Sequence, residues 1–140
     1  MKWIALNSEE QLKEINTSSE EKHYLIFKHS TRCPTSSMAL NRLERNWNEE
    51  LYKEITPYYL DLVKFRSVSD KTASNYNVTH ESPQILIIKG GKCIYNTSHM
   101  AISVDAIKEQ IHWKISFTYY FISAVYSLLF QFRLSETLLL

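Results

Sequence analysis

The stretch that decides the fold is HYLIFKHSTRCPTS, residues 23–36, where an apolar run leads into a cysteine and a proline. The run from His23 to His29 is mostly apolar, which is typical of a buried central β-strand. Pro34 fits the first turn of a helix, since the N–H that proline lacks would have no partner there. The apolar residues beyond it predict a helix from Pro34 to about Leu51. Cys33 is therefore predicted where the carboxyl end of a strand meets the start of a helix.

Outward from this stretch, strands and helices alternate along the chain. Strands separated by helices predict a parallel part of a sheet, and the pair Gly90-Gly91 between two apolar runs predicts a hairpin at an antiparallel edge. The predicted fold class is α/β, with a central mixed β-sheet flanked by helices. The other predicted elements are a short helix capped by Ser8, a strand over Pro57–Val63, a helix from Ser67 to about Tyr76 with Ser67 or Ser69 as its N-cap, strands over Gln84–Lys89 and Lys92–Asn96, and a last helix capped by Ser103 with Val104, Ile107 and Ile111 on one side.

Composition excludes several classes of function. The chain has 140 residues, the size of one domain, and its net charge of +1 comes without the basic cluster that nucleic-acid binders show. Its two glycines are adjacent, so neither a P-loop nor a dinucleotide-binding fingerprint is present. Two cysteines, Cys33 and Cys93, are too few for a disulfide scaffold or a four-cysteine zinc site, and no metal is expected. No secretory signal opens the chain, so a cytoplasmic protein is expected.

The carboxyl-terminal part differs in composition from the rest. Only Arg133 and Glu136 are charged beyond residue 114, which predicts a domain over residues 1–113 and an apolar, aromatic-rich helical tail over residues 114–140. Residues 115–132 are uncharged and reach the lower limit for spanning a bilayer. A polar stripe in this segment is more typical of a helix at a membrane surface or against a partner. Membrane contact, packing on the domain and an altered gene end all stay open.

Cys33 is the candidate nucleophile. A cysteine at a helix start lies among free backbone N–H groups and at the positive end of the helix dipole, and Arg32 adds a nearby cation. These surroundings favour the thiolate, which is the form that attacks disulfides. Ser36 stands where a Cys-x-x-Cys pair would have its second thiol, so the chemistry is predicted to be monothiol. The Ser36 hydroxyl is predicted either to donate a hydrogen bond to the Cys33 sulfur or to be an ordinary serine of the first turn.

The second cysteine, Cys93, falls within a predicted strand. Free cysteines in strands are more often small buried apolar groups than reagents, so we expect Cys93 to be structural. A disulfide between Cys33 and Cys93 is the alternative.

Three short segments together resemble the monothiol bacilliredoxin family. They are Lys28-His29-Ser30 leading into Thr31-Arg32-Cys33-Pro34-Thr35-Ser36, then His80-Glu81-Ser82-Pro83-Gln84, and then Thr97-Ser98-His99. The resemblance covers about residues 1–113 and ends where the aromatic tail begins. It implies a thioredoxin-like fold and the removal of bacillithiol from proteins that carry it as a mixed disulfide. It also implies S-bacillithiolated client proteins and free bacillithiol as partners, bacillithiol as a thiol co-substrate, and no tightly bound cofactor.

The resemblance also implies roles for individual residues. Cys33 would be the nucleophile, and Pro83, usually cis at this place, would face it. The backbone of Ser82 would pair with the bound thiol. Bacillithiol carries a malate group, so Arg32 and His80 are expected near its carboxylates.

Thr31 is a further expected ligand contact, and Pro34 and Ser36 are expected to support the site. His29 and His99 match the family pattern, and a structural hydrogen bond is the expected role of each.

Two other functions remain open from the sequence. One is a general glutaredoxin-like or thioredoxin-like reductase that uses another low-molecular-weight thiol. The other is a non-catalytic thioredoxin-like binding module that is anchored by its tail.

Overall fold

The computed structural model describes residues 1–20 and 22–111, and the predicted tail over residues 114–140 lies outside them. The described chain forms a five-stranded sheet in the order β1-β3-β2-β4-β5. Strands β1, β3 and β2 are parallel, whereas β4 runs antiparallel to β2 and β5 antiparallel to β4. The strands are β1 (Ile4–Ala5), β2 (His23–His29), β3 (Ile55–Asp61), β4 (Gln84–Lys89) and β5 (Lys92–Ser98).

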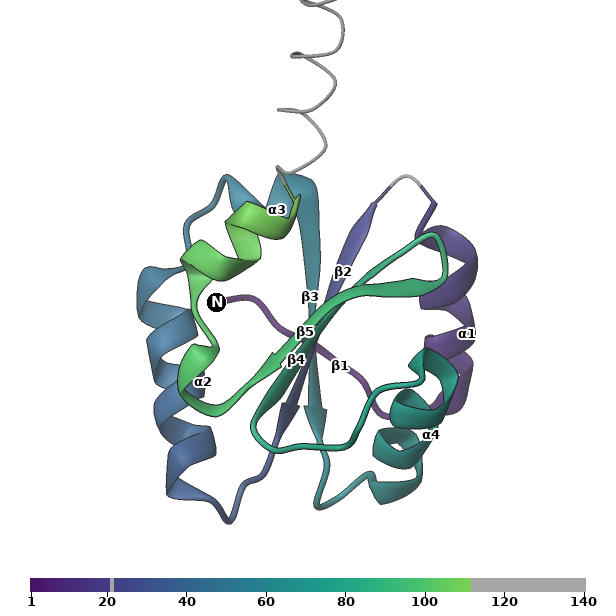
Figure 1. The fold of residues 1–140 in the computed structure, drawn as a ribbon, viewed down its shortest axis with the longest axis horizontal. Helices are drawn as coiled ribbons and strands as arrows, with labels where there is room; N and C mark the ends of the chain where they lie inside the picture. The colour runs from purple at the N-terminus through teal and green to yellow at the C-terminus, as the bar shows by residue number, and fades with distance from the viewer. Residues whose placement is uncertain (21, 112–140) are drawn as a thin grey trace, which may run out of the picture. The chain divides into compact units, whose positions relative to one another are not determined.

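Helices cover both faces of this sheet, with α2 on one side and α1 and α4 on the other (Figure 1). The helices are α1 (Glu9–Ser18), α2 (Pro34–Asn46), the single turn α3 (Leu51–Glu54), α4 (Arg66–Tyr76) and the 3-10 turn η1 (His99–Ala101), and residues 104–111 are also helical. None of the helices within the described residues is long and apolar enough to cross a membrane. The segment 115–132, for which membrane contact is an open prediction, lies outside this range.

A large apolar cluster fills the space between the sheet and the helices α1 and α4. Every second residue of β2 and β4 contributes to it, because side chains alternate between the two faces of a strand. Its buried members are Leu6, Leu12, Ile15, Tyr24, Ile26, Leu60, Val68, Tyr76, Leu86 and Ile88. Lys28 has the same parity along β2 as Tyr24 and Ile26, so its side chain lies on this face of the sheet, at the end where the strand stops.

Three local predictions are confirmed, two by hydrogen bonds and one by backbone angles. Ser8 caps α1 in a capping box, in which its Oγ accepts from the Gln11 N–H while the Gln11 side chain accepts from the Ser8 N–H. Gly90 and Gly91 form the hairpin turn, both with positive φ, as a two-residue turn of this kind requires. The Ser103 Oγ accepts from the Ala106 N–H and starts the last described helix.

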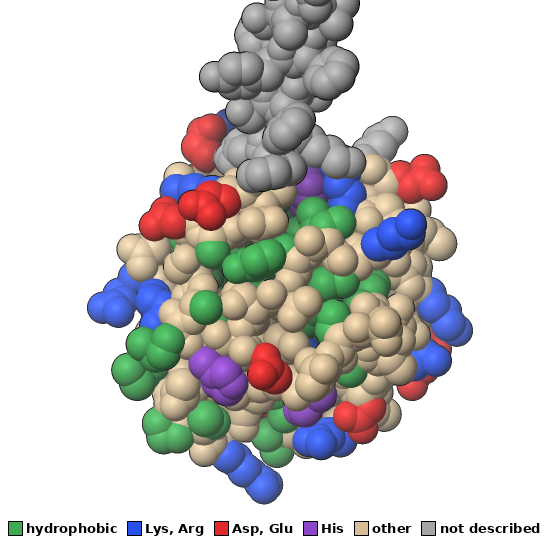
Figure 2. All heavy atoms as spheres, viewed as in Figure 1, with side chains coloured by type: hydrophobic (Ala, Val, Ile, Leu, Met, Phe, Trp, Pro, Cys, Tyr) green, Lys and Arg blue, Asp and Glu red, His purple; other side chains and the backbone are tan. Residues whose placement is uncertain are grey.

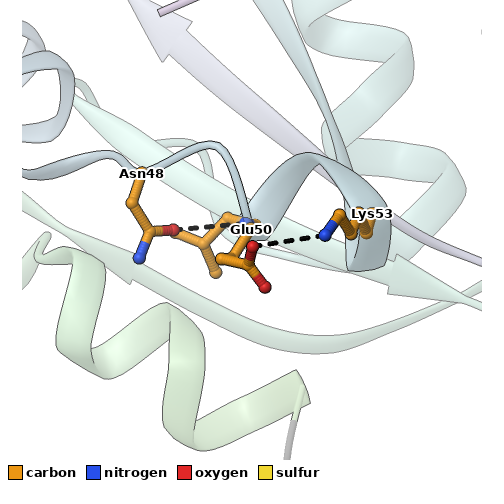
Figure 3. A network of polar contacts seen from close by, with 4 residues as sticks. Asn48, Glu50 and Lys53 are labelled. Carbon is orange, nitrogen blue, oxygen red and sulfur yellow. Dashed lines mark hydrogen bonds and ion pairs between the residues drawn. The ribbon is translucent and has the colours of Figure 1, made fainter.

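Helix α2 ends earlier than predicted. It stops at Asn46, not near Leu51, and the backbone at Trp47 is extended. The Asn46 side chain donates to the Arg42 carbonyl, and the Asn48 side chain accepts from the Leu51 N–H, so both asparagines bond to the backbone at this break. The short turn α3 then begins, with Lys53 donating to Glu50 across it (Figure 3).

The second predicted strand is also shifted, since β3 covers Ile55–Asp61 in place of Pro57–Val63. It ends at Asp61 because that carboxylate accepts from the N–H groups of Val63 and Lys64 and turns the chain. The N-cap of α4 is Phe65, so both serine alternatives were wrong. The two-residue strand β1 was not predicted, because two residues are too short for a periodic pattern.

Candidate functional site

Cys33 is the N-cap residue of α2, and Pro34 occupies the first helical turn, as the sequence predicted. The Cys33 N–H donates to the Ser30 carbonyl at 3.1 Å, and the Cys33 carbonyl accepts from the N–H groups of Ser36 and Ser37. The sulfur makes no capping hydrogen bond to the helix and is partly exposed to solvent. A partly exposed sulfur at the positive end of a helix dipole can act as the nucleophile that attacks a disulfide.

Ser36 is fully buried one turn into α2, and its hydroxyl is used away from the sulfur. Its Oγ accepts from the Ser30 N–H at 3.0 Å and shares a hydrogen bond with His29 Nδ1 at 2.8 Å. Neither alternative predicted for Ser36 describes this role. The hydroxyl ties the first turn of α2 to the end of β2, and so it fixes the loop that carries Cys33.

His29, the last residue of β2, is buried on the face of the sheet that α2 covers. Its ring lies against Phe27 and Tyr59, with centroid distances of 5.8 Å and 5.4 Å. Burial lowers the pKa of His29, and the nearby Asp61 carboxylate opposes this only in part. A neutral imidazole bonded to Ser36 is the structural hydrogen bond expected of this residue.

Ser82 and Pro83 lie at the same edge of the sheet as Cys33. They directly precede β4, whose first residue, Gln84, pairs with Lys28 near the end of β2. The Ser82–Pro83 peptide bond is cis, as the resemblance implied, and the Pro83 carbonyl accepts from the His99 N–H at 3.0 Å. The Ser82 Oγ is buried and makes no hydrogen bond within the described part of the chain. We call residues 79–83 the proline loop.

Lys28 and Gln84 hold the start of the proline loop, a pair of roles that sequence reasoning missed. Lys28 is fully buried and its Nζ donates to His80 Nδ1 at 2.6 Å. The Gln84 side chain donates to the Thr79 carbonyl and accepts from the Glu81 N–H. The signal in the sequence was a lysine at the end of an otherwise apolar strand, which is a rare place for an unpaired charge.

The remaining candidate residues are more exposed. Arg32 and Thr31 lie on the surface just before Cys33, and Arg32 forms no ion pair with another described residue. His80 is half-buried. At this edge, the lower one in Figure 2, histidine, acidic, basic and hydrophobic side chains come to the surface close to one another.

Cys93 lies far from this edge. It pairs with Ile88 near the hairpin end of β4, four residues from Gln84, or about 14 Å at the rise of an extended strand. Cysteines that form a disulfide have Cα atoms less than about 7 Å apart, and both cysteines are free thiols. The Cys93 sulfur donates to the Tyr95 carbonyl, and burial raises the pKa of the Cys93 thiol. The structure therefore does not bring the two sulfurs together.

Within the described residues, no group of three or more His, Cys, Asp or Glu side chains is placed to hold a metal ion.

Comparison with solved structures identifies the fold. A protein described as having a thioredoxin fold matches at 30% identity over 76% of this chain and 91% of its own, with a TM-score of 0.65. Thioredoxin of Malassezia sympodialis matches at 14% identity over 80% of this chain and 90% of its own, with a TM-score of 0.63. Thioredoxin of Fasciola hepatica matches at 16% identity over 76% and 94%, with a TM-score of 0.58. The predicted thioredoxin-like fold is confirmed.

The chain has a thioredoxin-like sheet, and a free cysteine lies at the start of the helix that follows the central strand β2. Together these two features define a thiol redox protein. The family described as monothiol bacilliredoxin BrxC matches residues 4–107. The chain therefore belongs to the monothiol bacilliredoxin family, as the three sequence segments indicated.

Proposed function

We propose that this protein removes bacillithiol from S-bacillithiolated proteins, with Cys33 as the only reacting residue. The observation that carries this proposal is the pairing of a partly exposed Cys33 at the α2 N-terminus with a buried serine, Ser36, at the place of a second thiol. The Ser36 hydroxyl is held by His29 and the Ser30 N–H, and a hydroxyl cannot form a disulfide. Family membership supports bacillithiol as the thiol.

The proposed reaction has two steps. The Cys33 thiolate attacks the bacillithiol sulfur of the mixed disulfide; a bond forms between these two sulfurs, and the client cysteine leaves as a thiolate that takes up a proton. A second bacillithiol thiolate then attacks the bacillithiol sulfur held on Cys33. This step releases bacillithiol disulfide and regenerates the Cys33 thiolate.

Two neighbouring groups fit this reaction. Arg32 is exposed beside Cys33 and forms no ion pair within the described chain, so its guanidinium is available for a carboxylate of the malate group. The proline loop lies at the same edge of the sheet, and the Ser82 backbone is proposed to pair with the bound thiol. Thr31, the exposed residue just before Arg32, is proposed as a further contact.

Intact-mass spectrometry of the reduced protein mixed with a bacillithiolated client tests the proposal. We expect one bacillithiol mass on the protein, lost in Cys33→Ser and kept in Cys93→Ser, together with the freed client. Uptake of glutathione or coenzyme A from equivalent clients, without uptake of bacillithiol, would identify a reductase for another thiol. Absence of any transfer would favour a non-catalytic binding module.

A further inference from the structure

Lys28 is the most unusual residue near the site, because a lysine ammonium is rarely fully buried. It lies in the central strand β2 between β3 and β4, in register with Leu60 and Gln84. Its side chain lies on the same face of the sheet as Tyr24 and Ile26 of the apolar cluster, where it is fully buried. An ammonium in such a place needs a hydrogen-bond partner, and His80 Nδ1, at 2.6 Å, is that partner.

The hydrogen bond fixes the state of His80 as well as its position. An ammonium group has only donors, so Nδ1 must accept and the ring proton must sit on Nε2. Burial and the charges of Lys28 and Arg66 lower the pKa of His80, against the opposing carboxylates of Asp70 and Glu81. A neutral ring results, and its Nε2–H makes no hydrogen bond to another described residue. His80 therefore presents a donor on the proline loop.

Lys28 and Gln84 act on this loop as a pair. Directly paired residues of antiparallel strands place their side chains on the same face, and these two side chains both reach the chain between Thr79 and Glu81. Gln84 bonds the backbone on both sides of His80, whereas Lys28 bonds the His80 ring. Together they fix the residues that lead into Ser82 and Pro83.

We propose that Lys28 is a positioning residue for thiol exchange: by holding His80, it keeps the proline loop beside Cys33 and aims the His80 Nε2–H at the bound thiol substrate. The inference rests on the proposed function only in taking a mixed disulfide as the substrate. Lys28 itself touches no substrate, since it is fully buried. Its effect should therefore be seen with substrates that extend over the proline loop and not with small disulfides.

The test measures the second-order rate at which the protein accepts a thiol from a peptide mixed disulfide. Lys28→Met and His80→Ala should each lower this rate by about tenfold or more, and the double variant should be no slower than the slower single variant, since the two residues act together. Lys28→Arg, which keeps a charged donor, should recover at least part of the loss. Lys64→Met, a change of an exposed lysine just after β3, should leave the rate unchanged.

Reaction with 5,5′-dithiobis(2-nitrobenzoate) separates positioning from damage to the thiol. This small disulfide needs only Cys33, so Lys28→Met should react within about twofold of the wild-type rate. An equal loss with the peptide and with the small disulfide would overturn the proposal, and so would an unchanged peptide rate. A histidine NMR titration gives a readout that does not depend on activity: in Lys28→Met the His80 midpoint should rise, because a neighbouring positive charge is lost.

The panel uses peptide mixed disulfides of bacillithiol, glutathione and coenzyme A. If the wild type accepts glutathione or coenzyme A in place of bacillithiol, the proposed function fails. The role of Lys28 is then tested by the rates of its variants with the peptide mixed disulfide of the accepted thiol. If the wild type accepts none of the three, both proposals are overturned.

Discussion

Lys28 and His29 are neighbours in β2, yet their side chains lie on opposite faces of the sheet and hold different loops. Lys28 donates to His80 on the face covered by α1 and α4 and holds the proline loop. His29 bonds to Ser36 on the other face and holds the turn that carries Cys33. One end of one central strand therefore sets the positions of both segments at the candidate site.

The two cysteines should differ in reactivity. At pH 7 we expect iodoacetamide to modify Cys33 at least tenfold faster than Cys93, as read by peptide mass spectrometry of partially labelled protein. Cys33 is partly exposed with no hydrogen bond from its sulfur to the helix. Cys93 is bonded to Tyr95, and burial raises its pKa. Equal labelling of both thiols, or faster labelling of Cys93, would contradict the assignment of Cys33 as the nucleophile.

Ser36→Ala should destabilise the fold by about 1–3 kcal/mol, because the change leaves the Ser30 N–H and His29 Nδ1 without the hydroxyl that pairs with them. Urea unfolding followed by circular dichroism measures the change. Ser37→Ala is the matched control: Ser37 is exposed in the same turn, and its loss should change the free energy of unfolding by less than about 0.5 kcal/mol. Equal effects of the two variants would mean that the buried hydrogen bonds of Ser36 contribute little.

The buried Lys28 should make stability depend on pH. Burial lowers its pKa to about 8 from an ordinary value of 10.5. Between these two values the unfolded chain binds more protons at this residue than the folded chain, so the free energy of unfolding should rise with pH. Below pH 8 Lys28 is protonated in both the folded and the unfolded chain, so its contribution to the free energy of unfolding no longer changes with pH. Over the whole window the rise from Lys28 is about 3 kcal/mol.

Comparison of wild type with Lys28→Met isolates this contribution. Tyr58, Tyr59, Tyr76 and Cys93 have raised pKa values and oppose the rise, but they are present in both proteins. We therefore expect the free energy of unfolding of wild type, minus that of Lys28→Met, to increase from pH 8 to pH 10.5. A difference that is constant across this range would mean that Lys28 stays charged in the folded protein.

The sequence was sufficient where the signal is local. Residue order along one segment predicted Cys33 and Pro34 at the start of α2, the capping of α1 by Ser8 and the glycine hairpin turn. The ends of α2 and β3 were misplaced, because side chains of Asn46, Asn48 and Asp61 bond to nearby backbone and end each element before the apolar pattern does.

Contacts between distant segments could not be predicted in this way. The bond from Lys28 to His80 spans 52 residues, and nothing in the spacing of the two indicates that they meet. Residue order alone places Ser36 where a Cys-x-x-Cys pair would have its second thiol. Its partner was not predicted, because the choice between Cys33 and His29 depends on which face of β2 each side chain occupies.

Ser36→Cys should convert the monothiol site to a dithiol site. Cys33 is the N-cap residue of α2 and residue 36 lies in its first turn, a spacing of three residues that brings side chains within the range that a disulfide can bridge. After Cys33 takes up bacillithiol, the new thiolate should attack the Cys33 sulfur and release bacillithiol as a thiolate, leaving an intramolecular disulfide. Intact-mass spectrometry should then find a chain lighter than the reduced protein by its two thiol hydrogens.

Thr35→Cys provides the control for this change, because residues two apart do not face each other on a helix. It should keep the bacillithiol adduct as wild type does. Persistence of the adduct in Ser36→Cys as well would show that position 36 cannot reach the Cys33 sulfur, and the monothiol chemistry would then not depend on having a serine there. Rapid loss of the adduct in Ser36→Cys alone would mean that this one hydroxyl makes the difference between a protein that must wait for a second thiol and one that resolves its own mixed disulfide.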